Sequence, residues 1–98
     1  GGAFNLVYAA AGHSQVRGLA LACMGEAEFG RGRYGEAIKW GKQALKNKAT
    51  SQDVYLLLGK AYYKQKNCKE ARIYYTKVLN GPNSTNPEAQ RGMELCKE

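Results

Sequence analysis

Apolar side chains recur every three or four positions along most of the chain, which is the spacing of one face of an α-helix. In residues 16–30 the recurring positions are Val16, Leu19 or Ala20, Cys23 or Met24, and Ala27. The same spacing returns in residues 34–48, 52–65 and 71–79. Polar or glycine-containing segments separate these stretches, at residues 30–32, 48–51, 66–67 and 81–86. The pattern therefore predicts consecutive helices joined by short turns.

Residues typical of helix starts stand at three of these boundaries. Asn67 and Glu70 have the spacing of a capping box. Ser51 is placed to cap the helix that follows it. Asn86 precedes Pro87, and proline is favoured at the first position of a helix. These signals predict a last helix over residues 87–98, covering the exposed side of the helix pair before it.

An internal repeat organises these helices. Residues 18–51 align with residues 52–85 at an offset of 34 positions, which places small residues on small ones, as with Gly25 on Gly59 and Ala37 on Ala71. Residues 3–11 fit the same frame as the second helix of a preceding unit. The sequence thus predicts a single domain over residues 1–98: half a unit (3–11), two units (18–51 and 52–85) and a closing helix (87–98), or about six helices.

The two units resemble the tetratricopeptide repeat. The second unit carries that family's pattern, a large residue followed by leucine-glycine, tyrosine, alanine and an aromatic residue, at Tyr55, Leu58-Gly59, Tyr62, Ala71 and Tyr75. The first unit departs from the pattern, with Glu28 in place of tyrosine and Gly41 in place of an aromatic residue. The resemblance implies an all-α, right-handed solenoid of antiparallel helix pairs. It also implies a non-enzymatic scaffold for protein–protein interaction.

In this family the first helix of each pair lines a concave groove that receives a peptide or a partner helix. On this chain the corresponding faces predict an apolar floor with cations beside it, and we expect six residues to contact the partner: Phe29, Leu56, Lys60, Tyr63, Lys64 and Arg91. The predicted ligand is an acidic or amphipathic protein segment. An apolar edge on the incomplete first unit could also self-associate.

The charge distribution leaves a second reading open. The formal net charge is +7, and residues 31–77 hold twelve lysines and arginines against three acids. Such a surplus favours acidic partners. Five tyrosines are interleaved with these cations, and stacking aromatics beside cations are what single-stranded nucleic acids need. A nucleic-acid-binding helical repeat is therefore the alternative function, with these tyrosines as its stacking residues: Tyr55, Tyr62, Tyr63, Tyr74 and Tyr75.

Other chemistry has little support in the sequence. His13 is the one histidine, lies in a predicted turn and has no catalytic partner at an informative spacing. No clustered metal ligands and no stretch of about 20 apolar residues occur, so we expect no enzyme activity, metal, cofactor or membrane span. The three cysteines are far apart, at Cys23, Cys68 and Cys96. This odd count predicts free thiols in a reducing compartment and hence a cytoplasmic location.

Overall fold

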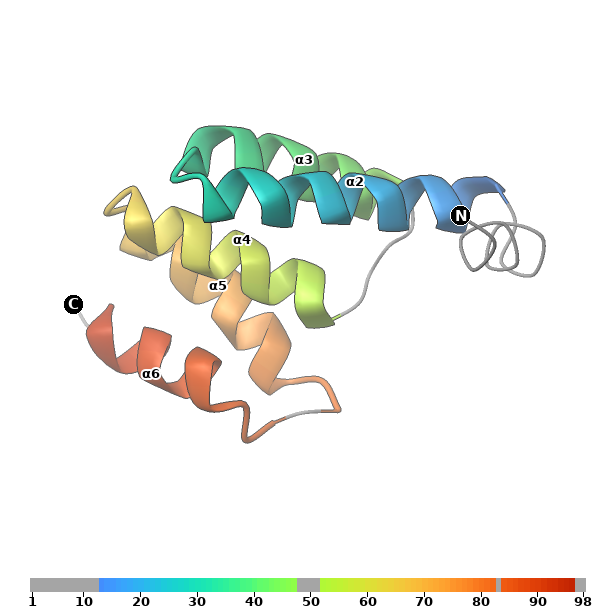
Figure 1. Ribbon diagram of the computed structural model, residues 1–98. Coiled ribbons are helices and arrows are strands. Elements are labelled where there is room, and N and C mark those ends of the chain that lie inside the picture. The colour runs from blue at the N-terminus through green and yellow to red at the C-terminus, as the bar shows by residue number, and fades with distance from the viewer. Residues whose placement is uncertain (1–12, 48–51, 83, 97–98) are drawn as a thin grey trace.

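A computed structural model describes residues 13–47, 52–82 and 84–96, with side chains from Arg17 onward (Figure 1). This part of the chain is all-α, as predicted. It contains five helices: α2 (His13–Gly30), α3 (Tyr34–Lys46), α4 (Gln52–Lys64), α5 (Cys68–Leu79) and α6 (Pro87–Leu95). The predicted half unit over residues 3–11 lies outside the described residues. The prediction that His13 lies in a turn is wrong, because α2 begins at this residue.

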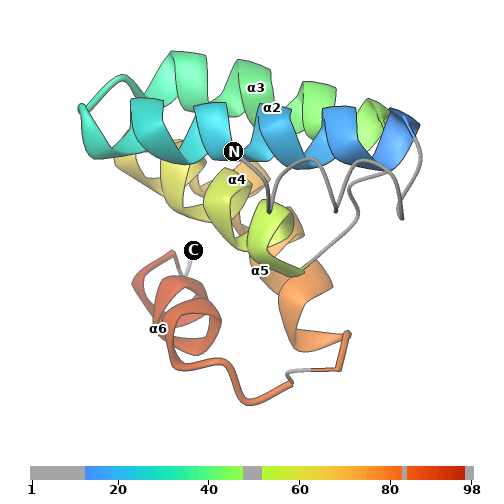
Figure 2. The ribbon, with the colours of Figure 1, turned by 45° about the vertical axis from the view of Figure 1, so that its right-hand side comes forward.

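The helices form antiparallel pairs that stack on one another. Helix α2 packs against α3, and α4 packs against α5, while α6 lies against both α5 and α4. In Figure 1, α2, α4 and α6 follow one another from top to bottom, and α3 and α5 lie behind them. Figure 2 shows α6 crossing below the α4–α5 pair, on the side away from α2 and α3. The closing helix, predicted over residues 87–98, ends at Leu95 and covers the free side of the last pair.

The two intra-pair turns are copies of each other at the 34-residue offset. Each is closed by a 2.9 Å hydrogen bond from a backbone N–H to the carbonyl five residues earlier, Arg33 to Glu28 and Asn67 to Tyr62. Each also places the preceding residue at positive φ, 79° at Gly32 and 63° at Lys66. This is the Schellman arrangement that commonly ends a helix. The sequence repeat is thus a repeat of backbone conformation.

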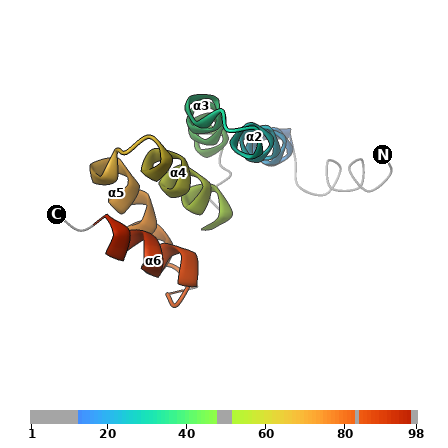
Figure 3. The same cartoon turned by 60° about the vertical axis from the view of Figure 1, so that its left-hand side comes forward.

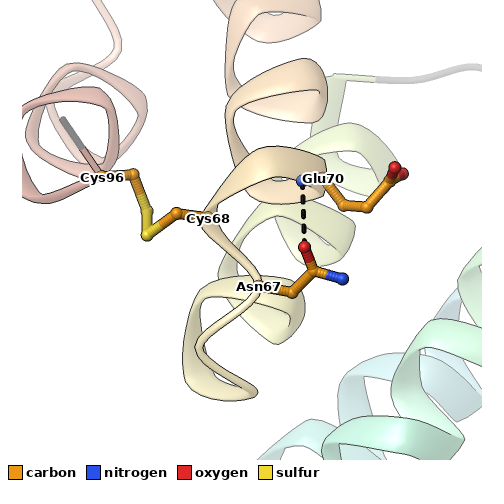
Figure 4. Close-up of a disulfide and its surroundings, with 4 residues drawn as sticks. All are labelled: Asn67, Cys68, Glu70 and Cys96. Carbon is orange, nitrogen blue, oxygen red and sulfur yellow. Dashed lines mark hydrogen bonds between the residues drawn. A yellow bond between two sulfur atoms is a disulfide. The ribbon is translucent and has the colours of Figure 1, made fainter. Parts of the chain in front are cut away.

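Asparagine side chains cap the starts of α5 and α6. The backbone N–H of Glu70 donates to Asn67 Oδ1 at 3.3 Å, which confirms the cap at the start of α5 (Figure 4). The N–H of Ala89 donates to Asn86 Oδ1 at 3.0 Å, and Pro87 occupies the first turn of α6. Such caps typically contribute about 1 kcal/mol each. Ser51, the third predicted cap, lies outside the described residues.

Helix α4 forms the centre of the core. Val54, Leu57 and Leu58 are almost completely buried, because α2, α3, α5 and α6 all pack around this helix. A small residue at position 25 explains how closely α2 and α4 approach each other, because a Cβ on Gly25 would lie 2.9 Å from Leu57 Cδ2 on α4. Gly25 is therefore a position where the packing of α2 on α4 leaves little room for a side chain.

A disulfide joins Cys68 and Cys96, so the prediction of three free thiols is wrong for these two residues (Figure 4). Cys68 is the first residue of α5 and Cys96 directly follows α6, and their Cα atoms are 5.1 Å apart. The sequence alone did not predict this disulfide, because 28 positions separate the two cysteines and the chain reversal after α5 brings them together. Cys23 is exposed and free. The cytoplasmic location, which rested on unpaired thiols, stays a prediction.

Candidate functional site

A groove opens on the side of the stack formed by the first helices of the pairs. Its cavity volume is about 160 Å³ and its walls come from α2, α4, α5 and α6. The lining residues are Phe29, Lys60, Tyr63, Lys64, Tyr75, Glu88, Arg91, Gly92 and Leu95. Five of the six predicted contact residues are among them. The structure thus brings together predicted contact residues that lie up to 62 positions apart in the sequence, from Phe29 to Arg91.

Leu56 is the predicted contact residue that the structure places elsewhere. Its side chain is 9% exposed and belongs to the hydrophobic core, and it is not among the residues lining the groove. The physical reason is the central position of α4. A helix surrounded by neighbours buries a wide arc of its surface, so Leu56, Leu57 and Leu58 are all inside. The expectation that Leu56 forms part of the groove floor is therefore corrected.

At the α2 end of the groove, an aromatic pair lies beside a lysine. The ring of Phe29 meets the ring of Tyr34 edge to face, with centroids 5.2 Å apart. Lys60 Nζ lies 5.1 Å from the centroid of Phe29. A lysine ammonium at this distance is attracted to the ring face by about 0.5–1 kcal/mol at an exposed site. Phe29 is thereby held at the edge of the groove.

Lys60 also has an acidic partner. Its Nζ lies 3.5 Å from Glu88 Oε2, across the groove from α4 to α6. Glu88 lies in the first turn of α6, where an acid is favoured by the positive end of the helix dipole, and the sequence analysis did not include it among the groove residues. An ion pair this exposed contributes less than about 1 kcal/mol. Its larger effect is to neutralise one of the three cations in the groove.

Tyr75 forms the inner wall of the groove. Its side chain is 3% exposed, and its ring is held between two glycines. A Cβ on Gly59 of α4 would lie 2.9 Å from the ring, and a Cβ on Gly92 of α6 would collide with it. Burial, together with the nearby Glu88 carboxylate, raises the pKa of Tyr75 to about 12. The phenol is therefore neutral at physiological pH and acts as a rigid packing surface.

Two cations of the groove remain available for a ligand. Lys64 and Arg91 are exposed, and neither forms an ion pair with any residue that the structure describes. Arg91 reaches this position because α6 repeats α4 at an offset of 35 rather than 34. The buried positions show this register, since Val54, Leu57 and Ala61 correspond to Ala89, Gly92 and Cys96. The preceding turn therefore holds one residue more than the 34-residue frame implies.

Most of the tyrosines that suggested nucleic-acid binding pack against other residues of the chain. Tyr62 is 7% exposed, and its ring stacks on Tyr74 with centroids 5.8 Å apart. Tyr55 stacks on the same ring at 6.5 Å. Tyr75 is buried in the groove wall, and Tyr63 is half-buried. Packing within the chain therefore accounts for four of these five rings, since two are buried and two are stacked, and the number of tyrosines alone does not indicate a nucleic-acid site.

The described residues contain no group of three potential metal ligands among histidine, cysteine, aspartate and glutamate. Within the same part of the chain, no helix combines the length and apolar character that crossing a bilayer requires.

Comparison with known protein families gives a match. A model of the TPR repeat, the tetratricopeptide repeat, matches residues 25–66, which run from the last turns of α2 through α3 and α4. No curated protein and no solved structure matches the chain. TPR repeats are typically non-enzymatic modules for interaction between proteins. Over these residues, and in its stacked antiparallel helix pairs, the chain is similar to the TPR repeat family.

Proposed function

We propose that this TPR module binds an acidic or amphipathic peptide segment in the groove between α2, α4 and α6. One observation carries the proposal: Lys64 and Arg91, which have no ion-pair partner in the described part of the chain, lie in the same groove as the apolar surfaces of Phe29 and Tyr63. Carboxylates satisfy the cations, and an apolar side chain covers the rings. The module acts as a scaffold and carries out no reaction.

The size of the groove supports a peptide rather than a small molecule. Pockets for small-molecule ligands usually measure about 300–1,000 Å³, whereas this cavity has about 160 Å³. A space of this size accepts one anchoring side chain. The remainder of the peptide would lie over the surface of α4 and α6, where Lys64 and Arg91 are exposed.

The test is a titration of a short labelled peptide that carries two glutamates beside one leucine. A peptide of about seven residues is too short to form a stable helix in water. Fluorescence anisotropy reports its binding to the wild-type chain and to Lys64→Glu/Arg91→Glu, for which we expect at least about tenfold weaker binding. The control is Lys39→Glu/Lys46→Glu, which makes the same charge change on exposed positions of α3.

Equal losses in both double variants would show that only net charge matters, and would contradict a defined groove. Displacement of the peptide by a single-stranded oligonucleotide, with a steep loss of affinity at higher salt, would support the nucleic-acid reading instead. Glu88→Gln provides a positive test. Because Glu88 neutralises Lys60, its removal is expected to tighten peptide binding by about twofold to fivefold.

A further inference from the structure

A second hollow lies on the opposite side of the last helix pair, on the outer face of α5. Its cavity volume is about 680 Å³, and its lining includes Lys69, Arg72, Ile73, Thr76 and Lys77 of α5 together with Met93 of α6. We call this surface the α5/α6 face. It shares no lining residue with the groove described above. In Figure 3, α5 and α6 lie beside each other on the side of the stack away from α2.

The α5/α6 face is positively charged and has no acid among its lining residues. Lys69, Arg72 and Lys77 form no ion pair within the described residues. Lys77 Nζ lies 5.7 Å from the ring of Tyr55. Arg72 Nε is inaccessible to solvent and has no hydrogen-bond partner among the described residues. A buried donor without an acceptor costs about 1–3 kcal/mol.

Comparison of the two units shows that this face departs from the repeat. In the first unit, Ile38 is 9% exposed and its neighbour Lys39 points to solvent. At the equivalent positions of the second unit the order is reversed: Arg72 takes the inner position, and Ile73 is 44% exposed. Both changes disfavour folding, because one exposes an apolar side chain and the other buries a polar atom.

We propose that the α5/α6 face docks an acidic amphipathic helix of a partner protein. A carboxylate of the partner pairs with the terminal nitrogens of the Arg72 guanidinium, which has no ion-pair partner within the described residues, and an apolar side chain covers Ile73. Arginine suits this role because its planar guanidinium binds a carboxylate through two parallel hydrogen bonds. The inverted order of the two residues then serves binding at the expense of stability.

The spacing of the cations favours a helix as the occupant. Lys69 and Lys77 are eight positions apart on one face of α5, which corresponds to about 12 Å or two helical turns. Met93 of α6 forms the opposite wall, so the surface is a trough between two helices. A helix laid in this trough would meet both lysines with acids at positions i and i+7 and would place an apolar residue between them over Ile73.

The experiment uses a synthetic helical peptide with glutamates at i and i+7 and leucines at i+3 and i+4, titrated against the full chain by anisotropy. The key variant is Arg72→Ile/Ile73→Lys, which restores the order found at Ile38 and Lys39 and leaves the net charge unchanged. We expect its thermal midpoint to equal or exceed that of the wild type, while peptide affinity falls at least about tenfold. Lys69→Glu/Lys77→Glu is expected to lose affinity to a similar extent.

The groove variant Lys64→Glu/Arg91→Glu distinguishes this site from the proposed peptide groove. It should bind the helical peptide as the wild type does. Retained affinity in Arg72→Ile/Ile73→Lys would overturn the proposal, since attraction by charge alone would then suffice. Loss of the helical peptide in the groove variant would overturn it as well, because the peptide would then occupy the groove. Preferential binding of phosphatidylserine vesicles that is abolished by Lys69→Glu/Lys77→Glu would assign the face to membranes and also contradict it.

Discussion

Reduction of the Cys68–Cys96 disulfide is expected to destabilise the domain and to loosen α6. The bond connects the start of α5 to the end of α6, across 28 sequence positions. Helix α6 has nine residues, too few to persist without tertiary contacts. Its other attachments include the contacts of Ala89 and Gly92 with the core, the packing of Met93 and the exposed pair between Lys60 and Glu88.

The magnitude follows from the length of the loop that the disulfide closes. Constraining a loop of about 28 residues in the unfolded chain stabilises the folded state by about 3.5 kcal/mol in the chain-entropy description. Small domains have total stabilities of about 5–15 kcal/mol. Loss of this one bond would therefore remove a large share of the stability, and it would also weaken ligand binding in the groove because Arg91 and Leu95 belong to α6.

Urea denaturation followed by circular dichroism measures this effect, with and without a phosphine reductant. The oxidised chain should react with one equivalent of a thiol reagent in denaturant, at Cys23, and the reduced chain with three. Cys68→Ser/Cys96→Ser should match the reduced wild type, and the control Cys23→Ser should match the oxidised wild type. Identical unfolding midpoints with and without reductant would refute the reasoning.

Three further predictions concern packing, a turn and pH. Gly92→Ala should lower the free energy of unfolding by about 1–3 kcal/mol, because a Cβ collides with the ring of Tyr75. Gly30 has open space around it, so Gly30→Ala should raise the free energy of unfolding by up to about 1 kcal/mol. Urea denaturation measures both changes. Lys66→Gly should raise the free energy of unfolding by about 1 kcal/mol in the same assay, since Lys66 has a φ of 63°. The raised pKa of Tyr75 contributes stability that is complete below pH 10 and is lost as pH rises to about 12, because the unfolded chain ionises first. A urea series across this range should show that fall, and Tyr75→Phe should reduce its slope.

The sequence was most informative where local chemistry decides the structure. The apolar period and the 34-residue offset predicted α2 to α5, and the boundaries of α4 agree with the prediction to within one residue. The caps at Asn67 and Asn86 depend on neighbouring residues alone, and both are confirmed. The disulfide could not be predicted in this way, because it depends on how far the chain travels between α5 and α6.

The groove was partly predictable for the same reason. Lys60, Tyr63 and Lys64 share one face of α4, so a helical repeat places them together. Glu88 was missed because the register of α6 is shifted by one residue relative to the repeat. Leu56 was misplaced because helical spacing gives the direction of a side chain but not how many neighbours surround the helix, and α4 is enclosed on most sides.

The central claim is that the groove between α2, α4 and α6 is the surface that holds a peptide. The most direct test is to map amide chemical-shift changes by two-dimensional NMR while the short acidic peptide is added to the oxidised chain. The account predicts that the changes concentrate at Phe29, Tyr63, Lys64, Arg91 and Leu95, the residues that line the groove. Changes confined to α3 or to the outer face of α5, with these residues unaffected, would contradict it.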